Sequence, residues 1–360
     1  MIPYGRQTID DDDIEAVIAV LRSDWLTQGP AIERFEQTVI AATGARHAIA
    51  FSSGTAALHG ACAAAGFGAG DRVATSPLSF VASANCARYM GADVSFVDID
   101  PTTLNLDPTA VPDGLDGLVA VHYAGLPVDL SKLAHRPRVI IEDAAQALGA
   151  ETPDGPVGNC ARSEMTCFSF HPVKAVTTAE GGVVTTNDDV LADRLRRFRT
   201  HGIHRPVTDE PWFYEVLETG FNYRLTDIQA ALGASQMGKL AFFMQRRRSI
   251  AARYDEELAD LDLIPAPRPV DGFAHGYHLY PIRVSNRHGV FAGLRKRGIA
   301  PQVHYVPIHH HPVYKSELWS LPACDKAYAG ILSLPIFPLL TDEDQSKVIE
   351  ALGQLVGRRQ

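Results

Sequence analysis

Short apolar runs rich in β-branched residues alternate with helical or loop segments through the first 143 residues, and this alternation constrains the fold more than any other feature. The runs occupy residues 47–51, 72–76, 93–98, 117–122 and 138–143. Apolar strands that are separated by helices are typical of a parallel sheet covered by helices on both faces. The sequence therefore predicts an α/β fold.

Two further apolar runs, at 165–170 and 181–187, lie only about ten residues apart. A gap of this length is too short for a helical crossover between parallel strands. We expect these two strands to be antiparallel neighbours or to be placed differently in the sheet.

The length of the chain, 360 residues, favours two domains. An amphipathic helix behind an aspartate cap is expected at the start, within residues 11–25, and another within 189–202, closed by Gly202. Residues 226–261 form a long helical run with a break near Gly238, and the segment from 262 onward suggests a smaller α+β domain. We therefore predict a large domain with its N-terminal segment at 1–240 and a small domain at 241–360.

Charge and composition exclude several classes of protein. The formal net charge is −9, and no basic block is longer than the stretch at 245–249, which argues against a nucleic-acid partner. No signal peptide or run of eighteen apolar residues is present, so we expect a cytoplasmic protein without a membrane partner. The five cysteines are scattered without a CxxC pair and are expected to be free, buried thiols.

The residues that directly follow the apolar runs are candidates for ligand binding, because open α/β sheets bind ligands beyond the carboxyl ends of their strands. Ser53, Gly54 and Thr55 form a turn before a helix, which suits either an anion site or a plain helix cap. Glu142 and Asp143 end another run; one should face the ligand crevice and the other point away. The carboxylate in the crevice either pairs with a structural arginine or binds a positive centre of a ligand.

Lys174 follows Ser169 in a loop of small residues, "HPVKAVTTAEGG". An isolated loop lysine is usually solvated, but a desolvated lysine near other positive groups becomes a nucleophile. A phosphate-binding turn, an aspartate at a strand end, a serine and a lysine, in this order, indicate a pyridoxal phosphate (PLP) site. In such a site the aspartate pairs with the protonated pyridine nitrogen and the lysine binds the aldehyde.

Five segments, "SSGTAALHGA", "SFVASANCARYMGADVSFVDID", "IEDAAQALGA", "FSFHPVKAVTTAEGG" and "GFNYRLTDIQAALG", resemble the DegT/DnrJ/EryC1 sugar aminotransferases in order and over nearly the whole chain. The resemblance implies fold type I, the PLP cofactor and a homodimer with shared active sites. It implies catalytic roles for Lys174 and Asp143. The cofactor contacts that it implies, besides those two, are Ser53, Gly54, Thr55, Phe80 (stacking on the ring), Gln146, Ser169 and Asn222 (reaching the neighbouring subunit's cofactor).

Some members of this family carry histidine in place of the lysine and act as dehydratases, so Lys174 favours transamination. The forms "FSFHPVK" and "QVHYVPIHHHPVY" most resemble the UDP-4-amino-4,6-dideoxy-N-acetyl-β-L-altrosamine transaminases of the pseudaminic acid pathway. The resemblance implies amino transfer from L-glutamate to C4 of a UDP-linked 4-keto-6-deoxy-N-acetylhexosamine. Candidate contacts to this substrate are His304, Tyr305, His309, Tyr314 and Arg224.

Other interpretations remain open at this point. They are an aminotransferase for another nucleotide 3-keto or 4-keto sugar, and a non-catalytic PLP-binding regulator, against which Lys174 and Asp143 argue. A nicotinamide enzyme is disfavoured because no GxGxxG follows the first strand. The histidines at 304 and 309–311 invite a metal site, but no acidic residue or cysteine lies within their cluster, so the sequence predicts a substrate-facing loop and no metal.

Overall fold

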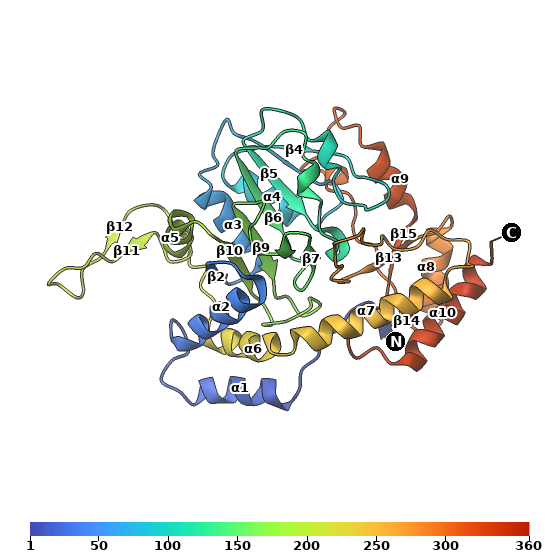
Figure 1. Cartoon of the computed structure of the whole chain (residues 1–360), viewed down its shortest axis with the longest axis horizontal. Coiled ribbons are helices and arrows are strands. Elements are labelled where there is room, and N and C mark those ends of the chain that lie inside the picture. Colours follow the sequence, from blue (N-terminus) through green and yellow to red (C-terminus); the bar gives the residue numbers. More distant parts are fainter. Residues whose placement is uncertain (360) are drawn as a thin grey trace.

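A seven-stranded sheet forms the centre of the computed structural model, which describes residues 1–359 (Figure 1). The strand order is β2-β10-β9-β6-β5-β3-β4. Strand bounds are β2 (His47–Phe51), β3 (Arg72–Thr75), β4 (Asp93–Phe96), β5 (Gly117–Val121), β6 (Val139–Asp143), β9 (Met165–Ser169) and β10 (Gly182–Thr186). The sequence predicted all seven of these strands.

Strand β10 is antiparallel to both of its neighbours, β2 and β9, whereas the pairs from β9 to β4 are all parallel. Of the two arrangements expected for the last two predicted strands, the structure has the first: they are antiparallel neighbours. Because β10 alone runs in the opposite direction, the carboxyl ends of β2, β6 and β9 lie at the same edge of the sheet. That edge is where the predicted ligand residues gather.

Helices cover both faces of the sheet, and alternate strand residues contribute to the two layers. Ile49, Cys167 and Val184 belong to the apolar cluster on the side of α3 (Gly54–Ala64), α4 (Ala82–Tyr89) and α5 (Asp189–Phe198). Their chain neighbours Phe168 and Val183 belong to the cluster on the side of α2 (Pro30–Thr43) and α6 (Asp227–Met237). Burial on both faces explains why these strands are apolar throughout.

Two sequence expectations about helices are confirmed and one is corrected. Helix α1 (Asp11–Leu21) begins with Asp10 as its N-cap, and the long helical run breaks at 238–239 between α6 and α7 (Leu240–Glu257). Helix α5, however, ends at Phe198 with Arg199 as its C-cap, so Gly202 does not close it. Gly202, with a φ of 73°, instead lies in the turn that leads into a hairpin.

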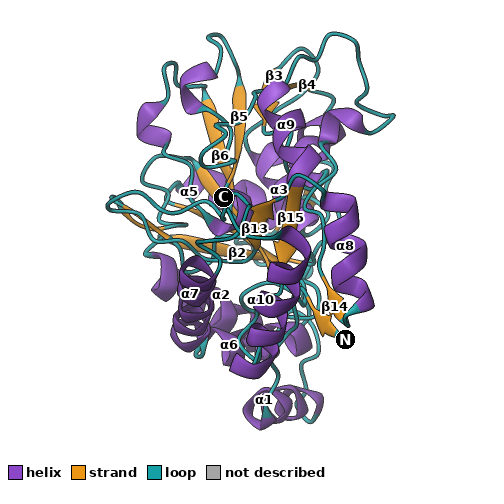
Figure 2. Ribbon diagram, turned by 90° about the vertical axis from the view of Figure 1, so that its right-hand side faces the viewer, coloured by secondary structure: helices purple, strands orange, loops and turns teal. Residues whose placement is uncertain are grey.

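The C-terminal segment has an apolar cluster of its own, which includes Ile250, Tyr280, Leu294 and Leu352. Its elements are β13 (Tyr280–Arg283), α8 (Arg287–Lys296), β14 (Ile299–Ala300), α9 (Pro322–Gly330), β15 (Ile331–Leu334) and α10 (Asp342–Val356). The N-terminal strand β1 (Ile2–Pro3) pairs with β14. Figure 2 shows the N-terminus beside β14. The division into domains at 240 and 241 stays a proposal; it falls at the start of α7.

Two short hairpins complete the fold: β7 (Glu151–Thr152) with β8 (Gly155–Pro156), and β11 (Ile203–His204) with β12 (Glu215–Val216). The second hairpin extends away from the body of the molecule beyond α5 (Figure 1). Val207, Trp212 and Val216 on this hairpin are exposed. Among the described residues, no helix has the length and apolar character needed to cross a bilayer.

Candidate active site

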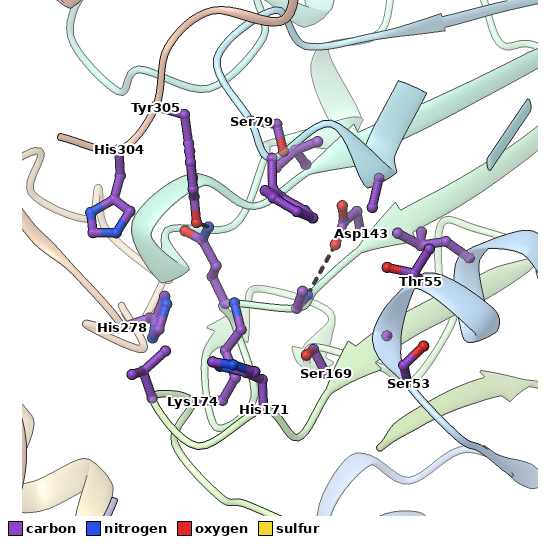
Figure 3. A pocket seen from close by; sticks show the side chains of 18 of the residues that line it. Ser53, Thr55, Ser79, Asp143, Ser169, His171, Lys174, His278, His304 and Tyr305 are labelled. Carbon is purple, nitrogen blue, oxygen red and sulfur yellow. Dashed lines mark hydrogen bonds between the residues drawn. The ribbon is translucent and has the colours of Figure 1, made fainter. Parts of the chain in front are cut away.

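A cavity of about 530 Å³ lies at the carboxyl edge of the sheet. It brings together most of the residues predicted for the cofactor: Ser53, Gly54, Thr55, Phe80, Asp143, Gln146, Ser169 and Lys174. Two of the residues predicted for the substrate, His304 and Tyr305, also line it. Figure 3 shows Ser53, Thr55 and Ser169 together at one end of the cavity and His278 and His304 at the other.

The first of these ends is suited to an anion. Helix α3 begins at Gly54, and the Ser53 hydroxyl caps it by accepting a hydrogen bond from the Ala56 N–H at 3.1 Å. A Cβ atom at position 54 would lie 2.8 Å from Cβ of Ser169, so only glycine fits beside this strand. The Ser53 hydroxyl hydrogen remains able to donate, and the first turn of a helix presents free N–H groups to negative charge.

Asp143 presents its carboxylate to the cavity at the end of β6. Its Oδ2 accepts a hydrogen bond from Ser83 Oγ at 2.6 Å. Its Oδ1 accepts one from the Ala145 N–H at 3.2 Å, the dashed line that leaves Asp143 in Figure 3. The Ser83 hydroxyl in turn lies 2.7 Å from that of Ser79. Only 5% of Asp143 is exposed, so this carboxylate is held in a fixed orientation in a largely desolvated site.

Glu142 points to the other side of the strand. It accepts hydrogen bonds from Ser163 Oγ at 2.5 Å and Thr166 Oγ1 at 3.2 Å, and its Oε2 lies 2.7 Å from His122 Nε2. Burial alone would raise the pKa of Glu142, but the contacts with His122, Ser163 and Thr166 outweigh it and lower that pKa. One carboxylate, Asp143, therefore faces the cavity and the other, Glu142, points away, as expected; among the described residues no arginine is hydrogen-bonded to Asp143, whose partners are Ser83 and the Ala145 N–H.

Lys174 lies in the loop between β9 and β10, where it is half-buried and faces the cavity. Burial lowers the pKa of its amine to about 8; Asp143 opposes this shift and Arg247 adds to it. Arg247 is itself fully buried, and its guanidinium donates to the backbone carbonyls of Tyr277, His278 and Ile336. A lowered pKa makes the unprotonated, nucleophilic amine available closer to neutral pH.

Aromatic and amide groups form the walls between the two ends. The ring of Phe80 is 57% exposed and lies 6.3 Å from that of Tyr305, so one of its faces is free for stacking. Gln146 accepts from the Ala124 N–H at 2.6 Å and donates to Tyr305 Oη at 2.9 Å. The amide of Gln146 is therefore already engaged by protein groups, and it positions Tyr305.

Two buried histidines form the other end of the cavity. Burial, and to a smaller extent the nearby Lys174, lowers the pKa of His304 to about 3. Burial is also the largest cause of the lowered pKa of His278, followed by Lys174. Both imidazoles are therefore neutral at neutral pH. Nδ1 of His304 lies 3.0 Å from Ser333 Oγ, which leaves its Nε2 free to face a ligand.

The remaining predicted residues do not line the cavity. Tyr314 donates a hydrogen bond to Asn85 Oδ1 at 2.7 Å, and His309 contacts Asp325 at 3.1 Å; both are buried, so the structure gives no support to their role as substrate contacts. Asn222 forms a backbone bridge with Thr200, and neither it nor Arg224 belongs to the cavity wall of this chain. Their roles stay predictions.

Sequence reasoning missed several residues of the site. Tyr4 and His278 line the cavity but come from segments far from any motif, so no local signal points to them. Ser79 and Ser83 could have been found, because they lie four residues apart in "SPLSFVASAN", directly after the β3 strand. Ser83 lies in the first turn of α4 and Ser79 in the segment just before it, so the two hydroxyls meet and that of Ser83 reaches Asp143.

Comparison with known proteins identifies the family. Residues 7–353 match the model of the DegT/DnrJ/EryC1/StrS aminotransferase family. The chain belongs to this family. The spore coat polysaccharide biosynthesis protein SpsC of Bacillus subtilis is 35% identical over 379 aligned positions, which cover 99% of this chain and 97% of SpsC.

Solved structures of other aminotransferases are similar along the whole chain. Helicobacter pylori PseC, an aminotransferase involved in the biosynthesis of pseudoaminic acid, has a TM-score of 0.91, 31% identity and 99% coverage of both chains. Streptococcus pneumoniae Spr1654, in its PMP form, has a TM-score of 0.92, 27% identity and 99% coverage of both chains. These neighbours have the mostly parallel fold type I architecture predicted from the sequence.

The DegT/DnrJ/EryC1/StrS aminotransferases depend on PLP, and Spr1654 has been solved in PLP and PMP forms, so PLP is the cofactor of this chain. The cavity fits it. The start of α3 at Gly54 and the hydroxyl of Ser169 lie together at one end of the cavity, Phe80 offers a free ring face, and Asp143 and Lys174 supply an anion and an amine. When bound, PLP supplies an aldehyde for amines and a pyridine ring that accepts the electrons of a substrate carbanion.

Proposed function

We propose that this family member transfers the amino group of L-glutamate to C4 of a UDP-linked 4-keto-6-deoxy-N-acetylhexosamine. The sugar class is supported by the similarity to PseC and by the segments that resemble transaminases of the pseudaminic acid pathway. The observation that carries the aminotransferase assignment is the placement of Lys174 and Asp143 in one cavity with the start of α3.

In this proposal the first turn of α3 and the hydroxyls of Ser53, Thr55 and Ser169 would hold the phosphate of the cofactor. Asp143, oriented by Ser83 and the Ala145 N–H, would keep a proton on the ring nitrogen, because its negative charge would stabilise the cation. Lys174 would hold the cofactor through its amine and, once released, that amine would remove and return a proton at the substrate carbon, for which its pKa of about 8 is well matched.

The neutral imidazoles of His278 and His304 and the hydroxyl of Tyr305 are proposed to orient the keto sugar. Hydrogen-bonding groups without charge can bind sugar hydroxyls without attracting the carboxylate of glutamate to the same place. Orientation of the ketone matters, because misplacement by about 1 Å can lower a rate about a hundredfold.

The substrate proposal is tested by offering the purified enzyme glutamate and a panel of UDP- and dTDP-linked 3-keto and 4-keto sugars. The aminated carbon is then identified by NMR. Highest kcat/KM for the UDP-linked 4-keto-6-deoxy-N-acetylhexosamine, with nitrogen at C4, supports the proposal. Preferred turnover of a dTDP-linked or 3-keto sugar would favour the alternative aminotransferase, and absence of any amino transfer by PLP-loaded protein would favour a non-catalytic regulator.

We further propose that the active unit is a cytoplasmic homodimer in which Asn222 reaches the partner's cofactor. The exposed hairpin that precedes Asn222, and the position of Asn222 outside the cavity of its own chain, support this arrangement. Mixing Lys174→Ala and Asn222→Ala chains should yield activity above that of either parent, because one site of each mixed dimer then has both residues. No gain after verified subunit exchange would contradict shared sites.

A further inference from the structure

Two adjacent histidines and an aspartate converge outside the cavity. His309 and His310 end the short 3₁₀ helix η4 (Ile308–His310), and Asp325 lies in the first turn of α9. Nε2 of His309 lies 3.1 Å and Nε2 of His310 lies 2.8 Å from the same Oδ1 of Asp325. Among residues 1–359 this is the only group of three or more His, Cys, Asp or Glu side chains with its potential ligand atoms within 4.8 Å of one another.

This arrangement removes the reason for which the sequence disfavoured a metal. No acidic residue is near the histidines in the sequence, but the fold brings Asp325 to them from fifteen residues beyond His310. Asp98 fixes the start of α9 by accepting hydrogen bonds from the N–H groups of Ala323 and Cys324, both at 2.9 Å. The position of Asp325 therefore follows from a capped helix end rather than from a mobile loop.

We propose that His309, His310 and Asp325 form a binding site for a divalent transition-metal ion. Ligand atoms about 2.0–2.1 Å from a tetrahedral ion are about 3.3 Å apart, so the two hydrogen-bonded pairs, at 3.1 and 2.8 Å, need to open by only a few tenths of an ångström to admit an ion. Two imidazole nitrogens and one carboxylate oxygen are a donor set for Zn²⁺, Co²⁺ or Ni²⁺, whereas Mg²⁺ and Ca²⁺ prefer oxygen ligands alone.

The exposure of the three residues determines what kind of site this is. His309 is buried, whereas the side chains of His310 and Asp325 are 38% and 50% exposed, so an ion can enter from solvent and keep water as a further ligand. Nδ1 of His309 has no hydrogen-bond partner, although histidine ligands usually donate this second ring N–H to an acceptor. With only three protein ligands, and with no acceptor to hold the ring of His309 in place, the site is expected to bind an exchangeable ion.

An ion at this site would join two parts of the C-terminal segment. The histidines follow His304 and Tyr305, which line the cavity, and Asp325 belongs to α9. None of the three proposed ligands lines the cavity, so the site is separate from the PLP chemistry and does not depend on the proposed substrate. We expect amino transfer to proceed in protein freed of metal.

The test uses the PLP-loaded protein after dialysis against a chelator. Titration with Co²⁺, followed by its visible absorption, and competition with Zn²⁺ should reveal one saturable site per chain. His310→Ala and Asp325→Asn should each raise the dissociation constant at least about tenfold. His311→Ala, which replaces the neighbouring histidine outside the cluster, is the matched control and should bind like the wild type.

Zinc X-ray absorption spectroscopy of the wild-type protein provides a measurement that does not depend on the folding of variants. The zinc-loaded protein should show scattering from two imidazole rings per ion. The proposal is overturned if the wild type has no saturable site, if the two variants bind with unchanged affinity, or if fewer than two imidazoles surround the zinc.

Discussion

The hydroxyl of Ser83 donates a 2.6 Å hydrogen bond to Oδ2 of Asp143, and both residues are buried. A hydrogen bond to a charged acceptor is roughly twice as strong as one between neutral groups. It also fixes which way the carboxylate points. We infer that Ser83, at the start of α4, positions Asp143 against the ring nitrogen of the cofactor.

Ser83→Ala should therefore lower kcat by about tenfold, corresponding to ~1.4 kcal/mol, with little change in KM for glutamate. Ser83→Thr keeps a hydroxyl at the same position and should restore most of the rate. Steady-state kinetics, together with the pH dependence of the cofactor's visible absorption, would measure the effect. An unchanged kcat in Ser83→Ala would show that the Ala145 N–H suffices to orient the carboxylate.

Gly54→Ala should weaken cofactor binding, because the added Cβ would meet Cβ of Ser169 at 2.8 Å. The start of α3 must then shift away from the strand, at a cost of about 1–3 kcal/mol. We expect the PLP dissociation constant, measured by fluorescence titration, to rise at least about tenfold. Gly68→Ala is the matched control, since a Cβ there meets no atom within 4 Å, and equal affinities for the two variants would refute this explanation.

Lys174 should destabilise the cofactor-free protein at neutral pH. Its pKa is about 8 in the folded chain against an ordinary value of 10.5, so the folded state binds this proton less tightly than the unfolded state does. The penalty is fully present below about pH 8 and disappears as the pH rises toward 10.5. Allowing for water in the cavity, it amounts to about 2 kcal/mol at pH 7.

Lys174→Met removes this penalty, so the cofactor-free variant should unfold at a higher urea concentration than the wild type at pH 7. The difference between the two proteins should shrink as the pH is raised from 8 toward 10. Lys132→Met, at an exposed lysine, is the control and should show no such trend. A Lys174→Met protein that is less stable than the wild type at pH 7 would contradict the depressed pKa.

The sequence predicted the sheet because its strands are buried on both faces and therefore stand out as apolar runs. It also excluded a parallel pairing of β9 and β10 through a crossover, because the chain between Ser169 and Gly182 is too short, and antiparallel neighbours were one of the two arrangements left. Residues that follow strand ends, such as Asp143 and Gly54, could be predicted as candidates for ligand binding. Open α/β sheets bind ligands beyond the carboxyl ends of their strands, so the strand pattern shows which residues lie at that edge.

Contacts between distant segments could not be read from the sequence. Which of Glu142 and Asp143 faces the cavity depends on the direction of β6 and on the partners His122 and Ser83. The pairing of Asp325 with His309 and His310 depends on how α9 packs against the preceding turn. Such contacts arise from tertiary packing, which local patterns do not encode.

We predict that Lys174 carries the cofactor in an enzyme that accepts amino groups. Reduction of the PLP-loaded protein with borohydride, followed by peptide mapping by mass spectrometry, tests this claim. The pyridoxyl mass should be found on Lys174, and it should disappear from this peptide when excess L-glutamate is added before the reduction. A pyridoxyl group on another lysine, or labelling of Lys174 that glutamate leaves unchanged, would contradict the claim.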